Sequence, residues 1–349
     1  MKKILAIALC LCTLITALVA CGEKTADYKL GMGVVVSMDS SKAGLAQVDA
    51  TVATVVTDAE GKIVACRIDV AQNKFDLTAD FAAQAAQTFK TKMEKGTEYG
   101  MAGKVDNDGN GVMLEWDAQT KAFEEYTVGK TAAEIKAMTT QEKNGHQITT
   151  DADLLAAGCS MQITDFIAAV AAACKDEQGV SFKTAAEFTL GVAAKTSAAD
   201  SAAATAEADG TVAMYTDFAA AVVADGKIIA ALNDAIQPKI TINAAGEITG
   251  KSYKATKRNL KEEYGMAPAL GYGMDWNNDG KVLEWYLQSA EFSKYVVGKS
   301  ADEVANLATK EVEGKGYVIS ADDALLNAGC TIQITSIKAV MAQAAKNAR

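Results

Sequence analysis

The sequence contains a long internal repeat, and this repeat restricts the folds that the chain can adopt. Gly61-Lys62-Ile63 recurs as Gly226-Lys227-Ile228, which is 165 residues later (226 minus 61). Glu98-Tyr99-Gly100-Met101 recurs at the same spacing as Glu263-Tyr264-Gly265-Met266. So many matches at one spacing indicate a duplication. The function of this chain therefore has to be sought in each copy of the repeat.

Both copies end with the same turn. It reads Ala157-Gly158-Cys159-Ser160 in the first copy and Ala328-Gly329-Cys330-Thr331 in the second. Each turn follows a Leu-Leu pair and precedes an alanine-rich amphipathic run, which is typical of a helix. A glycine before a helix permits a close approach of the backbone to a ligand, and a hydroxyl residue there can instead cap the helix by bonding a backbone amide.

The pattern of apolar residues predicts an α+β fold. Runs rich in glycine and β-branched residues predict strands over 30–38, 48–57, 63–70, 212–223 and 228–235. Helical spacing predicts helices over 116–126, 131–138, 166–174, 300–307 and 337–345. We therefore expect two tandem homologous units, residues 29–176 and 188–349, each a small antiparallel sheet packed with helices. Residues 177–187 are expected to be the linker, and the low-complexity stretch 197–209 a mobile loop.

The first residues predict export and a lipid anchor. Lys2-Lys3 form a positive segment, residues 4–18 are apolar, and Leu18-Val19-Ala20-Cys21 resembles the lipobox of bacterial lipoproteins. Cleavage after residue 20 would leave Cys21 to carry the lipid, with residues 21–28 as a polar tether. An ordinary secretory signal with an incidental cysteine is the alternative. The sequence thus predicts a location on the extracytoplasmic face of the bacterial membrane.

The charge of the chain argues against nucleic-acid binding. The formal net charge is -10, and removal of Lys2 and Lys3 with the signal leaves 32 positive and 44 negative groups, a net charge of -12. Such an acidic surface repels phosphate backbones. The membrane contact is therefore expected to come from the N-terminal lipid.

The residue types that catalysis needs are sparse, so we expect no enzyme. His146 is the single histidine and has no counterpart in the second copy, which argues against a histidine-based triad or a zinc site. A Cys159–Cys174 disulfide is one possibility for the remaining cysteines. The other is that Cys66, Cys159, Cys174 and Cys330 serve mainly as small buried hydrophobes.

An aromatic stripe lies on one predicted helix of each copy. Trp116, Gln119, Phe123 and Tyr126 follow helical spacing and therefore share one face. They would either pack on the sheet or form a surface on which a cofactor stacks.

A second motif, directly before this helix, fits a calcium loop. Asp106, Asp108, Asn110 and Asp117 fall at ligand positions of a calcium-binding loop, with the turn glycine Gly109 between them. An ordinary Asn/Asp/Gly turn is the alternative. The second copy offers Asp275, Asn277 and Asp279, but Tyr286 replaces the last carboxylate.

The order of these motifs supports a family resemblance. A Gly-Lys-Ile hairpin, a polar segment, and a small-Gly-small-Ser/Thr turn before a final helix make each copy similar to the FMN-binding domain of extracytoplasmic bacterial lipoproteins. In that family the turn reads Ser-Gly-Ala-Thr, and its hydroxyl can be joined through phosphate to FMN. The resemblance implies that Gly158 and Ser160, and likewise Gly329 and Thr331, bind FMN. This chain departs at Ala157 and Cys159, where the family has serine and alanine.

Two functions follow from this resemblance. The first is a membrane-anchored redox carrier with tandem FMN-binding-like domains. The second is a structural or ligand-binding surface lipoprotein that has kept the fold and lost the flavin.

Overall fold

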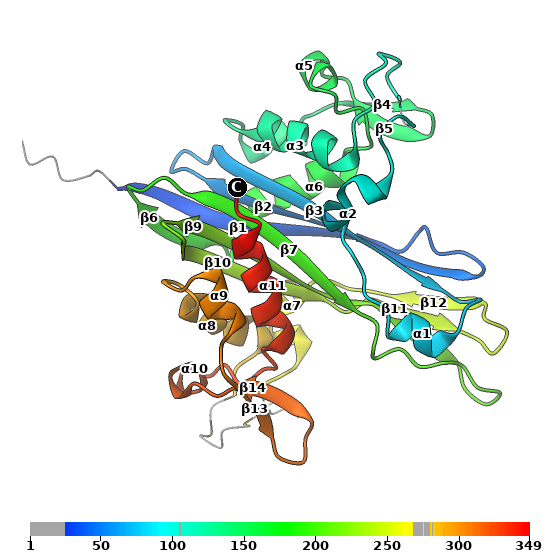
Figure 1. Ribbon diagram of the computed structural model, residues 1–349, viewed down its shortest axis with the longest axis vertical. Coiled ribbons are helices and arrows are strands. Elements are labelled where there is room, and N and C mark those ends of the chain that lie inside the picture. The colour runs from blue at the N-terminus through cyan, green and yellow to red at the C-terminus, as the bar shows by residue number, and fades with distance from the viewer. Residues whose placement is uncertain (1–24, 105, 268–274, 276–279, 281) are drawn as a thin grey trace, which may run out of the picture.

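Two antiparallel sheets lie at the centre of the structure, a computed structural model that describes residues 25–104, 106–267, 275, 280 and 282–349 (Figure 1). The strand order is β3-β2-β1-β6 in the first sheet and β10-β9-β7 in the second. The strands of the first sheet are β1 (Ala26–Ser37), β2 (Leu45–Thr57), β3 (Ile63–Asp76) and β6 (Val180–Thr184). Those of the second are β7 (Thr189–Ser197), β9 (Tyr215–Ala224) and β10 (Lys227–Ile236).

The predicted hairpins are confirmed, and their strands are longer than expected. In the first sheet β2 pairs with β3 along its whole length, so that Leu45 lies opposite Asp76. The turn between them closes on Asp58, whose carboxylate accepts hydrogen bonds from the backbone N–H groups of Glu60 and Lys62. Local sequence therefore determines these hairpins, because the β-branched runs and the turn residues favour the same structure.

One predicted strand, 212–223, is divided in two, so that prediction is wrong in detail. Residues Gly210–Ala213 form β8, which pairs with β11 (Lys239–Ile242) in a separate sheet that also contains β12 (Ile248–Ser252). The chain then passes the buried Met214 and enters the central sheet as β9. Both stretches are apolar, so composition alone could not locate the change of sheet. Within the expected mobile loop, Ala202 forms a β-bridge with Thr211.

Helices cover the outer face of each sheet. Figure 1 shows α3, α4 and α6 on one side of the two sheets and α8, α9 and α11 on the other. In the first half these helices are α3 (Trp116–Thr127), α4 (Ala132–Lys136) and α6 (Thr164–Cys174). Their counterparts are α8 (Trp285–Tyr295), α9 (Ala301–Ala305) and α11 (Thr335–Lys346).

The last helix of each half lies very close to its sheet. A Cβ atom at Gly31 would come within 2.0 Å of the backbone oxygen of Ala173 in α6. At Gly191 in β7 the same atom would lie 1.9 Å from the oxygen of Ala344 in α11. Only glycine permits this approach, since no real Cβ tolerates such contacts.

The two halves share one hydrophobic core. The inner faces of both sheets meet in a cluster that includes Val52 from the first half and Val192, Phe218 and Leu232 from the second. Each sheet also packs on its own helices through one further hydrophobic cluster. The expected linker 177–187 contains strand β6, which pairs with β1 and so belongs to the first sheet. The chain is thus of the α+β class, and its halves are packed face to face.

Short elements connect these layers. The helical ones are α1 (Phe81–Ala85), α2 (Lys92–Lys95), η1 (Gly96–Tyr99), α5 (Ala152–Ala156), α7 (Lys257–Leu260), η2 (Lys261–Tyr264) and α10 (Asp323–Asn327). The remaining strands are β4 (Thr140–Lys143), β5 (His146–Thr149), β13 (Thr309–Val312) and β14 (Tyr317–Ser320). Within the described ranges, no helix has both the length and the apolar character needed to cross a membrane. The signal sequence 1–20 and Cys21 lie outside the described residues, and β1 already begins within the expected tether, at Ala26.

Candidate functional site

A buried glutamine fixes the terminal turn of each half by accepting hydrogen bonds from the backbone of the turn. Gln119 in α3 accepts hydrogen bonds from the backbone N–H groups of Ser160 and Met161, both at 3.0 Å. Gln288 in α8 accepts from the N–H of Thr331 at 2.7 Å. Both glutamines are fully buried. The duplicated glutamine of the aromatic stripe therefore fixes the shape of the turn.

The two hydroxyl groups proposed to accept FMN are buried by this arrangement. Ser160 is 1% exposed and Thr331 is 0% exposed. The hydroxyl of Thr331 donates to Gln288 Oε1 at 3.3 Å, whereas Ser160 Oγ has no hydrogen-bond partner among the described residues. Gly158 and Gly329 adopt positive φ angles, 90° and 96°, which glycine favours. In this conformation neither hydroxyl is accessible for attachment of a flavin.

The four cysteines among the described residues are free thiols, and the possible Cys159–Cys174 bridge is not formed. Burial raises the pKa of Cys159 and of Cys330 to about 12, so both stay protonated at neutral pH. Cys66 is buried as well, and Cys174 is partly buried. The interpretation of these residues as small hydrophobes agrees with their positions in the outer clusters.

The aromatic stripe packs on its own sheet, as one of the two interpretations proposed. Phe123 is fully buried, and Phe166 of α6 lies edge-on to it at 5.4 Å between ring centroids. Trp116 is only 2% exposed and meets the same phenylalanine at 6.0 Å. Trp116 nevertheless also lines a pocket, so one end of the stripe reaches a surface where a ligand can bind.

Each half has a pocket at the same place, between its terminal turn, its aromatic helix and the end of its central sheet. The pocket of the first half, called the first pocket, has a volume of about 410 Å³, and that of the second half, the second pocket, has about 600 Å³. Both lie within the range of roughly 300–1,000 Å³ found for small-molecule sites. The matched lining residues are Gln72 and Gln237, Lys92 and Lys257, Tyr99 and Tyr264, Met101 and Met266, Trp116 and Trp285, and Gln162 and Gln333.

A lysine lies over two aromatic rings in both pockets. The ammonium group of Lys92 is 4.9 Å from the ring centroid of Tyr99 and 5.4 Å from that of Trp116. Lys257 repeats the arrangement, at 5.0 Å from Tyr264 and 5.2 Å from Trp285. Neither lysine forms an ion pair with any residue that the structure describes. Each pocket thus presents a positive charge that lies over the faces of two rings and is not held in an ion pair. Burial raises the pKa of the pocket residues Asp165 and Asp217, and the charges of Lys92 and Lys257, respectively, partly offset this rise.

A buried carboxylate positions the short helix that carries this lysine. Asp69 in β3 accepts a hydrogen bond from the backbone N–H of Met93 at 3.2 Å, at the start of α2. Asp234 in β10 accepts from the N–H of Arg258 at 3.0 Å, at the start of α7. Burial raises the pKa of both groups, and that of Asp69 reaches about 6. These carboxylates therefore serve the pocket indirectly, by anchoring the helix.

A second carboxylate in each half fixes the loop behind the tyrosine. Glu115 accepts hydrogen bonds from the backbone N–H groups of Met101 at 2.9 Å and Ala102 at 3.2 Å. Glu284 accepts from Met266 in the same way, at 2.9 Å. Burial opposes ionisation of Glu115, but the backbone donors outweigh it and lower the pKa of the carboxyl group. Two carboxylates consequently fix the aromatic wall of each pocket, one at the helix that carries the lysine and one at the loop that follows the tyrosine.

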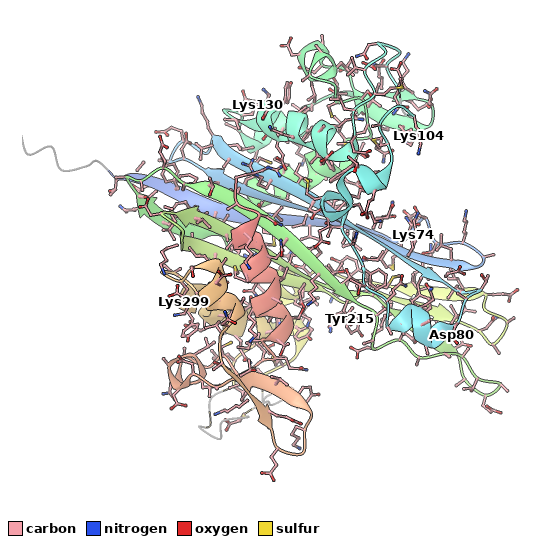
Figure 2. The ribbon with its side chains drawn as sticks, viewed as in Figure 1. Lys74, Asp80, Lys104, Lys130, Tyr215 and Lys299 are labelled. Atoms are coloured by element: carbon pink, nitrogen blue, oxygen red, sulfur yellow. The ribbon has the colours of Figure 1, made fainter. Side chains whose placement is uncertain are left out.

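A second duplicated contact ties the aromatic helix to the segment before the turn. The hydroxyl of Tyr126 donates to Asp151 at 2.5 Å, and that of Tyr295 donates to Asp322 at 2.6 Å. Lys130 and Lys299, which Figure 2 labels on opposite sides of the central sheets, lie over these two tyrosine rings. The contacts are structural, since none of these residues lines either pocket.

The wall opposite the lysine differs between the two pockets. The first pocket has Asp49 and Asp165, and burial together with the charge of Asp49 raises the pKa of Asp165. In the second pocket Ser336 replaces Asp165 and donates a hydrogen bond to the partly buried Asp217. His146 lines the first pocket where the second has Tyr317.

The predicted calcium loop is folded on itself in the first half. Both carboxylate oxygens of Asp106 accept hydrogen bonds from backbone N–H groups of residues 109–111, at 2.8–3.1 Å. Asn110 donates to Asp108 at 2.7 Å, and Asp117 accepts from the N–H of Ala118. Such bonds are typical of an ordinary Asx turn. In the described part of the chain, no three His, Cys, Asp or Glu side chains are grouped to hold a metal ion.

Calcium binding at the first loop stays a prediction. In the second loop, Asn277 and Asp279 lie outside the described residues.

The sequence did not identify Lys92, Tyr99 and Gln72 as site residues, although the same residue types recur at the equivalent positions of the second half. The matches Thr91-Lys92 on Thr256-Lys257 and Gln72 on Gln237 were visible as signs of duplication. What the sequence alone did not show is that they converge on Trp116.

Comparisons with models of known protein families, with curated proteins and with solved structures find no match for this chain. The residues of the two pockets are therefore the basis for a function.

Proposed function

We propose that this protein is a non-enzymatic, lipid-anchored ligand-binding protein on the extracytoplasmic face of a bacterial membrane. In this proposal each half holds one small molecule in its pocket. The lipobox-like sequence ending at Cys21 supports the anchor, and the acidic charge of the chain supports the absence of nucleic-acid partners.

The duplicated lysine over two aromatic rings is the observation on which the proposal depends. Two pockets with the same lysine, tyrosine and tryptophan have kept this combination in both copies while other positions changed. An ammonium group with no carboxylate at ion-pair distance can pair with an anionic group of a ligand. The rings of Tyr99 and Trp116 favour a ligand with a flat body. We therefore infer a planar, anionic small molecule.

Glutamines complete the site. Gln72 and Gln162 line the first pocket, and Gln237 and Gln333 line the second. A primary amide both donates and accepts hydrogen bonds, so these residues could orient the polar edge of a flat ligand.

A titration with a matched pair of probes tests this function. FMN has a planar ring and an anionic phosphate, and riboflavin has the same ring without the phosphate. We expect FMN to quench the fluorescence of Trp116 and Trp285 with a stoichiometry of two, and riboflavin to bind about tenfold more weakly, because an ion pair contributes of the order of 1.5 kcal/mol. If FMN and the planar anion anilinonaphthalene sulfonate both failed to give saturable quenching, the proposal would be wrong.

Covalent attachment of FMN is the second candidate function, as an electron-transfer lipoprotein. The position of Ser160 supports it, because its hydroxyl has no partner among the described residues and the next residue, Met161, lines the first pocket. Attachment would require the buried turn to open. Intact mass and the visible spectrum of the mature protein, made in a host that attaches flavin, test this candidate. A change of both Ser160 and Thr331 to alanine should abolish the adduct, and flavin retained by this double variant would exclude it.

A further inference from the structure

A third cavity lies in the second half, away from the two pockets, and a smaller one of about 180 Å³ lies at the equivalent place in the first half. The cavity of the second half is enclosed by β10, α8 and the segment before β6, has a volume of about 320 Å³, and is called the α8 cavity here. Its apolar lining residues are Val180, Ala231, Leu232, Leu287, Ala290 and Val297. Leu287 is 38% exposed and Val297 is 45% exposed. Large apolar side chains thus remain partly uncovered around this space.

The N–H group of one buried side-chain amide in the lining lacks an acceptor. Asn233 is 2% exposed, and its Oδ1 atom accepts a hydrogen bond from the hydroxyl of Ser293 at 2.8 Å. Ser289 donates to the backbone oxygen of the same residue at 3.1 Å. The Nδ2 group of Asn233 has no acceptor among the residues that the structure describes. A buried donor without an acceptor is costly, so this N–H group favours a ligand that brings an oxygen atom.

The charged groups at the cavity are already neutralised. Arg258 pairs with Asp176 at 3.0 Å, and Lys294 pairs with Glu291 at 2.7 Å. No carboxylate lines the cavity. A charged ligand would therefore lose hydration without gaining an unpaired partner.

The equivalent space in the first half is narrower, about 180 Å³, and Arg67, Ile68 and Arg349 line it. Ile68 and Glu124 occupy the positions of Asn233 and Ser293, according to the repeat. Glu124 is buried and pairs with Arg349 at 2.7 Å and with Arg67 at 3.6 Å. The side chain of Arg349 reaches this site from the end of α11, in the other half.

The second half has no arginine at the position equivalent to Arg349. Gln178 stands at the position of Arg349, and its side-chain amide donates instead to the backbone oxygen of Arg258 at 3.0 Å. The first half thus satisfies its buried polar group with an ion pair. The second half leaves an open, apolar space with one free donor.

We propose that the α8 cavity binds a small, uncharged amphiphile. Its carbonyl or hydroxyl oxygen accepts a hydrogen bond from Asn233 Nδ2, and its alkyl chain packs on Leu232, Leu287 and Val297. The volume suits a chain of medium length, at the lower end of small-molecule sites. This site is independent of the ligand proposed for the two pockets, since the α8 cavity shares no lining residue with them.

Three matched probes test the proposal by calorimetric titration and by NMR of the side-chain amide of Asn233. Hexanamide has a neutral carbonyl, hexanoate has a charged one, and hexane has none. We expect hexanamide to bind most tightly and to shift the Asn233 amide signal. Asn233→Ile, which copies the first half, should weaken hexanamide at least tenfold and leave hexane unchanged.

Two further variants keep the test decisive if Asn233→Ile folds poorly. Ala290→Phe should block the cavity and abolish binding of all three probes, while Lys121→Phe at the equivalent position of α3 should leave binding intact. The exposed Lys136→Met, at a residue that lines none of the three spaces, should leave binding of all three probes unchanged. Hexanoate binding as tight as hexanamide would overturn the proposal. So would binding that survives Ala290→Phe, or an absence of saturable hexanamide binding.

Discussion

The two pockets share one wall and differ in the other. Both use a lysine over a tyrosine and a tryptophan, with a buried glutamine and glutamate behind them. Across from this wall, Asp165 of the first pocket corresponds to Ser336 of the second. Under the proposed function, the shared wall would bind a feature common to both ligands, and the variable wall would make the two ligands, or their affinities, differ.

Loss of the glutamine behind the shared wall should have the largest effect. Gln119→Leu would leave the N–H groups of Ser160 and Met161 buried without acceptors, so we expect the free energy of unfolding to fall by roughly 3 kcal/mol. Gln288→Leu should cost a similar amount. Because the halves share a core, urea unfolding followed by tryptophan fluorescence should show one transition in both variants. The exposed Gln141→Leu is the control, and an effect confined to one half would contradict the equivalence.

The anchoring carboxylates should differ in their pH dependence. Burial raises the pKa of Asp69 to about 6, whereas the charge of Arg258 partly offsets burial at Asp234. Between about pH 4 and 6 the folded protein keeps the Asp69 proton and the unfolded chain loses it, so the unfolding free energy falls as the pH rises. Asp69→Asn should remove about 3 kcal/mol of this decline.

Urea unfolding at a series of pH values measures the effect. The matched variant Asp234→Asn should change the profile less. An equal or larger change in that variant would show that Arg258 does not distinguish the two sites.

Removal of either lysine should separate the two binding sites. Lys92→Met and Lys257→Met should each leave one FMN site unaltered and weaken the other about tenfold, or by roughly 1.4 kcal/mol, so that one class of two sites becomes two classes of one. Quenching of tryptophan fluorescence is the readout, and the exposed Lys136→Met is the control. Two unaltered sites in both lysine variants would refute the role given to the shared wall.

Exchange of the variable wall should have the smallest effect. Asp165→Ser gives the first pocket the residue of the second and removes a negative charge near the phosphate, so FMN should bind about threefold more tightly there. Ser336→Asp should weaken the second site by a similar factor. Titrations at low and high salt measure both, since screening should diminish an electrostatic difference. Changes in the same direction in both variants would show that charge is not the cause.

Much of the fold could be predicted because its signals are local. The hairpin β2–β3 follows from β-branched runs around Asp58 and Gly61, and α3 follows from the helical spacing of Trp116 and Phe123. The split of 212–223 and the pairing of β6 with β1 could not be foreseen, because both depend on which sheet lies nearby.

The candidate site was predicted only in part. The sequence directed attention to the terminal turns and to the aromatic helix, and both border the pockets. It placed the functional atoms at Ser160 and Thr331, whose hydroxyl groups the structure buries. A hydroxyl before a helix has the same sequence signature whether it faces a ligand or the interior.

The sequence by itself determined the repeat, the hairpins and the helices, because each is visible in the order and spacing of residues along the chain. The lipid-anchored, extracytoplasmic location stays a prediction. Tertiary structure alone decided that Lys92 lies over Trp116, that Arg349 narrows a cavity of the first half, and that the equivalent cavity of the second half is larger. These contacts join residues that are distant in the chain. Their proximity results from the packing of the two sheets on a shared core, which no local pattern specifies.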